Sequence, residues 1–318
     1  MQAMLELLQR AELTVPLFIL IAIGYMLMRC FKWPQEVSDA LTRFVFSVAL
    51  PALLFSMMSD LSQLPPVDTR LLIAFFGSCL VVFALGRLLA SKVFRLDGVS
   101  GSVFALGGVF SNNAMLGIPM AKALLGPEAL PSVALVLVFN ALTLWTLVTI
   151  SVEWARHGSL SLEGFTKTAW SVITNPIVAA IIGGTVVGLA GIHLPTVVKA
   201  PLTMISQAAA PMSLIALGMG LAEYGIRTGW QQSVAICVLK LVMQPLVIWL
   251  IARALHLPLL ETQVVVLLGS IAVGANVYLM SRHFRTMEGP IAASLVLTTA
   301  LSAINTPVAL TLVSLSAS

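Results

Sequence analysis

The chain has 318 residues, of which 59% are hydrophobic and only 9% are charged. A soluble globular protein carries about 25% charged residues, so this chain lacks the charge to cover a surface that faces water. Its net charge of +4 comes from basic residues that lie singly between apolar stretches, and this pattern indicates membrane topology rather than binding of nucleic acid.

Apolar stretches bounded by charged residues predict ten membrane-spanning helices. In the first half they occupy 14–30, 38–59, 70–91, 101–125 and 131–154. In the second half they occupy 171–191, 197–222, 229–255, 261–283 and 289–314. The stretches are continuous rather than alternating with a period of two, which favours helices over an outer-membrane barrel. The predicted fold class is therefore an all-α polytopic membrane protein.

Lysine and arginine are divided unequally between the two sides of the membrane. Ten spans place both termini and the even-numbered connections on one side, which holds five basic residues: Arg10, Arg70, Lys122, Lys199 and Arg253. The other side holds eleven: Arg29, Lys32, Arg43, Arg87, Lys92, Arg95, Arg156, Lys167, Arg227, Arg282 and Arg285. Because an excess of basic residues marks the cytoplasmic side, we expect the linker 155–169 in the cytoplasm and both termini outside.

Proline spacing indicates an internal repeat. Pro16 and Pro51 in the first half are 35 residues apart, and so are Pro176 and Pro211 in the second half. Each half has an odd number of spans, so the second copy enters the membrane from the opposite side. The spacing therefore predicts two inverted five-helix repeats, a common plan of secondary transporters. These domains are 1–154 and 170–318.

Two spans are interrupted at equivalent places by polar residues and glycine. The fourth span contains Ser111, Asn112 and Asn113, and the ninth contains Gly274 and Asn276. Such breaks free backbone N–H and C=O groups, which hydrocarbon tolerates only where they line a cavity or bind something. We therefore predict a central substrate site at these residues; the alternative is close helix packing through small residues. Helix breaks or hinges are also expected at Pro51, Gly117, Pro119, Pro211 and Gly274.

Lys240 is the one ionisable residue deep inside a predicted span, SVAICVLKLVMQPLVIWLIARAL. A charged lysine at the bilayer centre costs about 3 kcal/mol on insertion scales, so it needs a compensating partner. That partner is either an anionic substrate or the carbonyl groups of a broken helix, and both interpretations stay open. An arriving carboxylate would favour the charged lysine, which offers a route to proton coupling. Lys240 is accordingly a candidate substrate-binding residue.

The remaining reactive side chains form no recognisable catalytic or metal site. The thirteen carboxylates fall in loops or near span ends, and neither an HExxH nor a GxSxG motif occurs. The GxxxxGK[ST] motif that binds ATP is missing as well. The sequence therefore predicts no enzyme activity, no cofactor and no metal.

Four stretches carry a resemblance to a known family: ALPALLFSMM in the second span, LGIPMAKALLG after the fourth-span break, LKLVMQP around Lys240, and SRHFRTMEGPIAASLVLTTALSAINTP across the last two spans. On these motifs the chain resembles the auxin efflux carrier family, in its bacterial branch, over nearly its whole length. The run KLVMQPLVIW is most similar to members assigned to malonate and related carboxylates.

The resemblance implies a bile acid symporter-like fold in which the broken fourth and ninth helices cross near the membrane midplane. It also implies a scaffold of helices 1, 2, 6 and 7, often dimeric, and a mobile unit of helices 3–5 and 8–10. Plant members have a proline at the crossover, whereas this chain has Asn112 and Asn113 in one break and Gly274 and Ala275 in the other. This departure weakens the case for a plant-hormone substrate.

Together these features predict a secondary active transporter of the bacterial inner membrane, with periplasmic termini. It is expected to move a small organic anion, such as malonate or another dicarboxylate, by alternating access. Coupled H+ or Na+, the lipid bilayer and a second copy of the chain are the expected partners. The alternatives are an uncoupled facilitator or channel, a transporter-like sensor, and a carrier of an auxin-like aromatic carboxylate.

The charge bias predicts how the chain is labelled from outside intact cells. In a chain otherwise free of cysteine, a cysteine placed beside His157 should be protected from an impermeant thiol reagent, because the basic residues keep that side in the cytoplasm. A cysteine beside Lys122 is the matched control and should react. The opposite labelling pattern would reverse the topology.

Overall fold

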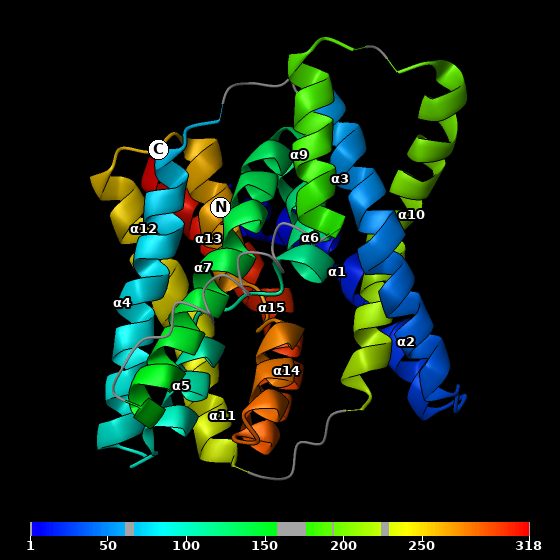
Figure 1. Cartoon of the computed structure of the whole chain (residues 1–318). Helices are drawn as coiled ribbons and strands as arrows, with labels where there is room; N and C mark the ends of the chain where they lie inside the picture. The colour runs from blue at the N-terminus through cyan, green and yellow to red at the C-terminus, as the bar shows by residue number, and fades with distance from the viewer. Residues whose placement is uncertain (1, 61–66, 158–175, 193, 224–228, 318) are drawn as a thin grey trace.

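Helices make up the fold in the part of the chain that the structure describes. The structure is a computed structural model, and it describes residues 2–60, 67–157, 176–192, 194–223 and 229–317. Six of the helices in these ranges are long and apolar enough to cross a membrane, and shorter apolar helices accompany them. The prediction of an all-helical polytopic membrane protein is confirmed (Figure 1).

The first half of the chain begins with a long helix and continues with several shorter ones. Its elements are α1 (Gln2–Arg29), α2 (Gln35–Phe44), the π-helical η1 (Val45–Ala49), α3 (Leu50–Ser59), α4 (Arg70–Lys92), α5 (Gly98–Gly107), the π-helical η3 (Asn113–Gly117), α6 (Ile118–Leu125), the 3-10 helix η4 (Pro127–Ala129) and α7 (Leu130–His157). Helix α7 continues through the first three residues of the expected linker 155–169. The rest of that linker lies outside the described residues.

The second half repeats this alternation of long and interrupted helices. Its elements are α9 (Pro176–Leu189), α10 (Thr196–Leu221), α11 (Trp230–Val238), the π-helical η5 (Leu239–Met243), α12 (Gln244–Ala254), α13 (Leu259–Ser270), α14 (Ala275–His283) and α15 (Glu288–Ala317). Each of the ten predicted segments is occupied by one or more of the described helices. The number of membrane crossings and the inverted repeat stay predictions.

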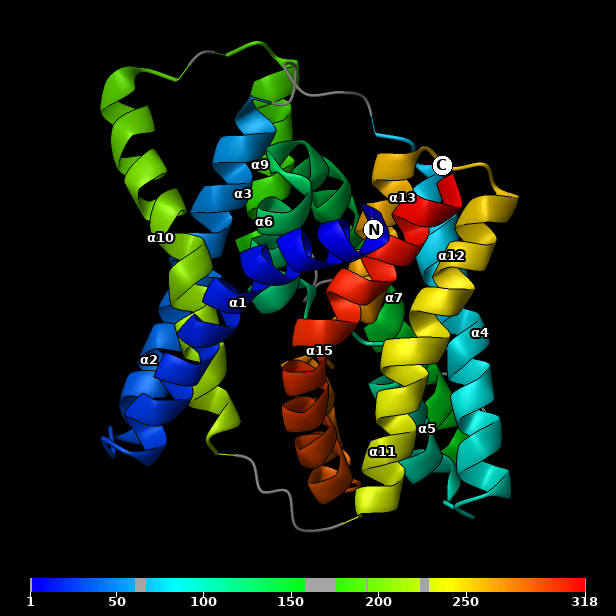
Figure 2. The same cartoon turned by 180° about the vertical axis from the view of Figure 1, so that it is seen from behind.

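The helices gather into two groups. Helices α2, α3, α9 and α10 stand together on one side, and α4, α5 and α11 to α15 stand on the other, with α6 and α7 between them (Figures 1 and 2). Helix α1 packs on α10 and crosses the middle of the molecule to α15 (Figure 2). The pairs α1 with α10 and α3 with α9 pack most extensively. The division into scaffold and mobile helices that the resemblance implies stays a prediction.

Two glycines let α1 and α10 touch through their backbones. A Cβ atom on Gly24 would lie 2.1 Å from the carbonyl oxygen of Ile215, and one on Gly218 would lie 1.9 Å from that of Ile21. In a membrane, where the hydrophobic effect does not drive helices together, such small residues allow the close contacts that hold them. The α1–α10 interface therefore depends on both positions lacking a side chain.

Three of the helices widen into a π-helical turn just before a proline. The segments η1, η3 and η5 each end two residues before Pro51, Pro119 or Pro245. A proline inside a helix has no N–H to donate, and its ring clashes with the carbonyl four residues earlier. The π turn moves that carbonyl away, so each chain passes its proline without ending the helix.

The carbonyls released by two of these prolines are paired by side chains from other helices. The carbonyl of Met115, four residues before Pro119, accepts a hydrogen bond of 3.1 Å from Ser213 Oγ on α10. The carbonyl of Leu241, four residues before Pro245, accepts one of 2.9 Å from Asn305 Nδ2 on α15. The expected break at Pro211 is different, because α10 runs through Pro211 as one helix.

Gly218→Ala should destabilise the protein, because its methyl group forces α1 and α10 apart; overpacking of this kind costs about 1–3 kcal/mol. Gly220→Ala is the matched control on the same helix, since a Cβ there meets nothing within 4 Å. Thermal unfolding in detergent should therefore show a lower melting temperature for Gly218→Ala alone. Equal melting temperatures for the two variants would contradict the close α1–α10 contact.

Candidate functional site

Two interrupted helices pass each other at the centre of the structure. Helix α5 and the following η3–α6 are separated by residues 108–112, and α13 and α14 by residues 271–274. The backbone N–H of Asn112 donates to the carbonyl of Ala272 at 2.9 Å, and that of Gly274 donates to the carbonyl of Phe110 at 2.8 Å. Each interruption thus pairs some of the free backbone N–H and C=O groups of the other. Together they form an antiparallel bridge between Ser111 and Val273.

The crossing is tight and is braced from a third helix. A Cβ atom on Gly274 would lie 3.0 Å from the carbonyl oxygen of Ser111 and equally close to the ring of Phe110. The backbone N–H of Val273 donates to Thr298 Oγ1 on α15 at 3.0 Å. The ninth-span interruption therefore begins three residues before the expected Gly274–Asn276 stretch, and Asn276 lies in the first turn of α14.

Four half-helices meet at the crossing, two with their C-terminal ends and two with their N-terminal ends. Helices α5 and α13 reach it with their C-terminal ends, while η3–α6 and α14 start from it with their N-terminal ends. The first backbone N–H groups of a helix have no partner within that helix and carry the positive end of its dipole. Asn112 caps the start of η3, where its side-chain oxygen accepts a bond of 3.4 Å from the N–H of Met115. Both starting helices therefore offer positive ends at the crossing.

A cavity opens at these two helix starts. Its empty volume is about 600 Å³, with the space open to the surroundings included. The lining residues are Phe46, Phe110, Ser111, Asn112, Asn113, Ala114, Met115, Leu137, Asn140, Ile177, Val178, Gly274, Ala275 and Asn276. They come from both helix groups. The predicted site residues Ser111, Asn112, Asn113, Gly274 and Asn276 are thus brought together, and every lining side chain is uncharged.

Several polar atoms at the cavity have no hydrogen-bond partner among the described residues. They are Ser111 Oγ, Asn112 Nδ2 and Asn113 Oδ1, and all three side chains are buried. An unpaired buried donor or acceptor costs about 1–3 kcal/mol, so a structure retains such groups where water or a ligand pairs them. Three of them on one cavity wall indicate a binding site.

Asn140 on α7 is a site residue that the sequence did not reveal. It is buried, lines the cavity, and its Oδ1 accepts a bond of 3.4 Å from Asn113 Nδ2. Its only signal in the sequence is an amide inside the continuous apolar run LVLVFNALTL. A single asparagine in such a run could have been singled out, since a polar group in hydrocarbon needs a partner.

Lys240 lies outside the set of residues that line the cavity. Its side chain is fully buried, and its ammonium donates to the carbonyl of Gly269, in the last turn of α13. The last carbonyls of a helix lack partners in that helix and carry the negative end of its dipole. The observed contact is therefore the cap of a broken helix, the second of the two interpretations of this lysine.

Gln244, one turn after Lys240, makes the matching contact to the other broken helix. Its Nε2 donates to the carbonyl of Val109, just beyond the end of α5, at 2.9 Å. The η5–α12 segment thus supplies donors to the C-terminal ends of both α5 and α13. With these two C-terminal ends capped, the two N-terminal ends remain beside the cavity, and the side-chain cap among them is the one from Asn112 to the N–H of Met115.

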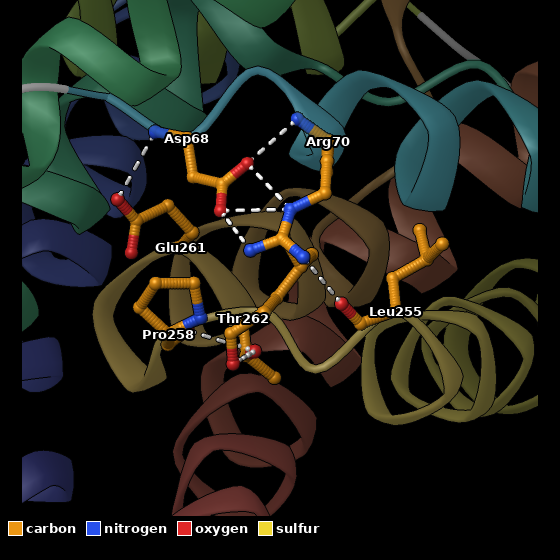
Figure 3. Close-up of polar contacts among 7 residues, drawn as sticks. Asp68, Arg70, Leu255, Pro258, Glu261 and Thr262 are labelled. Atoms are coloured by element: carbon orange, nitrogen blue, oxygen red, sulfur yellow. Dashed lines mark hydrogen bonds and ion pairs between the residues drawn. The ribbon is translucent and has the colours of Figure 1, made fainter.

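A separate polar cluster ties the connection between α12 and α13 to the start of α4 (Figure 3). Arg70 pairs with both carboxylate oxygens of Asp68 and donates to the carbonyl of Leu255 at 3.0 Å. These hydrogen bonds from Arg70 hold the pKa of Asp68 below its ordinary value. The N–H of Asp68 lies 3.4 Å from a carboxylate oxygen of buried Glu261. No residue of this cluster lines the cavity, so we assign it a structural role.

Among the described residues, no group of three or more histidine, cysteine or acidic side chains lies close enough to hold a metal ion. The cavity has neither a nucleophile beside a base nor a pair of carboxylates among its lining residues. The groups that it offers to a ligand are side-chain amides, a hydroxyl and helix ends.

Comparison with known proteins gives consistent results over nearly the whole chain. The sequence profile of a family described as membrane transport proteins matches residues 11–310. A protein of Rhizobium meliloti (strain 1021) named "Putative malonate transporter" is 26% identical over 296 residues, which cover 91% of each chain. An uncharacterized transporter of Methanocaldococcus jannaschii is 22% identical, covering 92% of this chain and 94% of its own. An uncharacterized transporter of Escherichia coli K12 is also 22% identical, covering 88% of this chain and 90% of its own.

Gly274→Val should disrupt the crossing, because the added atoms meet the Ser111 carbonyl and the Phe110 ring. We expect a loss of about 1–3 kcal/mol of stability, seen as a lower melting temperature in detergent. Gly77→Val on α4 is the control, since a Cβ there makes an ordinary contact with Ile251 at 3.7 Å. A Gly274→Val protein as stable as the control would show that the backbones do not approach so closely.

Proposed function

Since the chain belongs to the membrane transport protein family, we propose that it is a secondary carrier that moves a small organic anion, such as malonate or another dicarboxylate, by alternating access. The family match confirms the resemblance to the auxin efflux carriers. The name of the relative from Rhizobium meliloti supports malonate as the first substrate to test. The bacterial inner membrane, with both termini in the periplasm, remains the proposed location.

The observation that carries this proposal is the cavity at the two helix starts. Two N-terminal helix ends point their backbone N–H groups toward one small volume, and such ends attract anions without a dedicated arginine. The unpaired Asn112 Nδ2 adds a side-chain donor. Among the described residues no carboxylate lines the cavity, so its wall carries no full negative charge.

A dicarboxylate suits this arrangement better than a single carboxylate does. The two helix starts, at Asn113 and Ala275, belong to different broken helices and approach the cavity from opposite chain directions. Each start can take one carboxylate of a short diacid. The methylene group between the two carboxylates would then contact the apolar lining side chains Phe46, Leu137 and Ile177.

Alternating access requires that one helix group move against the other. The cavity lies where they meet, because Phe46, Ile177 and Val178 belong to η1 and α9, while the crossing belongs to the other group. We assign α1, α2–α3, α9 and α10 to the scaffold, and the remaining described helices to the mobile unit. A shift of the mobile unit would carry the crossing, with its bound anion, past the scaffold residues.

Lys240 acts in this proposal through the helix that it caps. Its positive charge at the C-terminal end of α13 offsets the negative dipole end there. The positive ends of η3–α6 and α14 then remain beside the cavity, although no cation lines it among the described residues. This arrangement gives an anion preference without a salt bridge that would hold the substrate too tightly to release.

Counterflow in proteoliposomes tests the function directly. Vesicles loaded with unlabelled malonate should accumulate labelled malonate from outside, and succinate should compete better than acetate, because it carries two carboxylates. Repeating the assay with and without a proton or sodium gradient identifies the coupling ion. Malonate uptake without any counterflow would identify an uncoupled channel, and the absence of transport of every carboxylate tested would refute the proposal.

Asn113→Leu and Asn276→Leu should each weaken malonate binding by about 10- to 100-fold, the loss expected when one hydrogen bond to a charged group is removed. The control is Gln263→Leu, which removes an amide on α13 that bonds Ser314 away from the cavity. Binding is measured by calorimetry on protein that elutes as one species. Unchanged affinity in both asparagine variants would move the site elsewhere.

A further inference from the structure

A second feature of the molecule is an apolar groove between α12 and α15, which shares no lining residue with the cavity at the crossing. Its walls are formed by Val242, Leu246 and Trp249 on one helix and by Val308, Leu312 and Leu315 on the other. The empty volume is about 1080 Å³, with the space open to the surroundings included. Leu312 is 61% exposed and Leu246 is 44% exposed, so the groove opens onto the outer surface of the helix bundle. In a membrane protein that surface faces lipid.

The groove continues into a polar mouth at the end of α12. A neighbouring cavity shares Trp249, Val313 and Ser316 with the groove, and adds Arg253 and His256, which are both exposed. Figure 2 shows the C-terminal end of α15 beside α12 at this place, where Arg253 donates to the carbonyl of Ser316 at 2.8 Å. Among the described residues, no carboxylate side chain lines either cavity. The mouth is therefore cationic and the groove below it is apolar.

The length of the groove matches one leaflet of a bilayer. Along α15 it runs from Asn305 to Ser316, which at 1.5 Å per residue is about 16 Å, or half of a hydrocarbon core about 30 Å thick. Trp249 lies between the two parts, and its ring NH donates to Ser316 Oγ at 3.2 Å. Tryptophan favours this depth, where hydrocarbon meets the headgroups. The Arg253 guanidinium, 5.6 Å from the centre of that ring, then lies at headgroup level.

From this match of length, polarity and charge we propose that the groove is a binding site for an anionic phospholipid. One acyl chain fills the groove between α12 and α15, and the phosphate lies at Arg253 and His256. A zwitterionic lipid with the same chains fills the groove equally well, but its own positive charge weakens its attraction to the cationic mouth. The site is independent of the transport function proposed above.

The inner end of the groove gives this lipid a contact with the transport machinery. Asn305, which lines the groove there, donates to the carbonyls of Leu241 and Ser270 at 2.9 and 3.1 Å. Ser270 is the last residue of α13, one of the two broken helices. A bound chain therefore packs against the residue that ties α15 to the crossing, and we expect it to raise the melting temperature.

Native mass spectrometry of the full chain in detergent tests the proposal, with phosphatidylglycerol and phosphatidylcholine of identical acyl chains as probes. The protein should bind phosphatidylglycerol more tightly. Each basic residue near an anionic headgroup is worth about fivefold in affinity, so Arg253→Gln with His256→Gln should reduce that preference by at least this factor. Lys122→Gln, which removes an exposed cation at the end of α6, is the control and should keep it.

A second variant tests the groove apart from its mouth. Leu312→Trp fills the groove from its exposed side and should reduce binding of both lipids, while elution as a single folded species shows that the variant is intact. Equal binding of the two lipids by the unmodified protein would overturn the proposal, because the contact would then be with unselected bilayer lipid. Unchanged binding in Leu312→Trp would overturn it as well, since no chain would then occupy the groove.

Discussion

Backbone N–H and C=O groups freed in the middle of a membrane must find partners within the protein, and the rest of this structure depends on how that requirement is met. The two interruptions satisfy part of it mutually, through the bonds from Asn112 to Ala272 and from Gly274 to Phe110. Lys240 and Gln244 satisfy the C-terminal ends of the broken helices. What remains at the crossing is two N-terminal ends and a few unpaired polar atoms beside a cavity. In the function that we propose, a bound anion meets the part of the requirement that remains.

The same requirement explains the π-helical turns. Proline is tolerated in a membrane helix when neighbouring side chains pair the carbonyl that it releases. Here Ser213 and Asn305 do so, and each links the helix that contains the proline to another. Pro119 and Pro245 therefore do more than bend their helices. They create carbonyl acceptors that hold η3 to α10 and η5 to α15, around the crossing.

Much of this architecture can be predicted from the sequence. The features that cannot be predicted depend on contacts that form only in the folded protein. The scarcity of charge and the continuous apolar runs predict an all-helical membrane protein, and glycine and asparagine in two runs predict the residues that meet at the cavity. The place of Asn140 at the cavity does not follow from the sequence, because its hydrogen-bond partner Asn113 is distant along the chain. The role of Lys240 depends on Gly269, which is near it only in the folded protein. A proline in the sequence predicts a break or a hinge. In the structure the helix widens before Pro119 and continues through Pro211, and the outcome depends on the helices packed around each proline.

The central claim is that an organic anion binds at the N-terminal ends of the two broken helices, and not at Lys240. Solid-state NMR of the protein in lipid, with 15N in the protein and 13C in the carboxylates of malonate, measures which nitrogen atoms lie close to the bound anion. Binding at the helix starts should give strong dipolar coupling to the backbone nitrogens of Asn113, Ala114, Ala275 and Asn276. Coupling to the side-chain nitrogen of Lys240, with none at these helix starts, would contradict it.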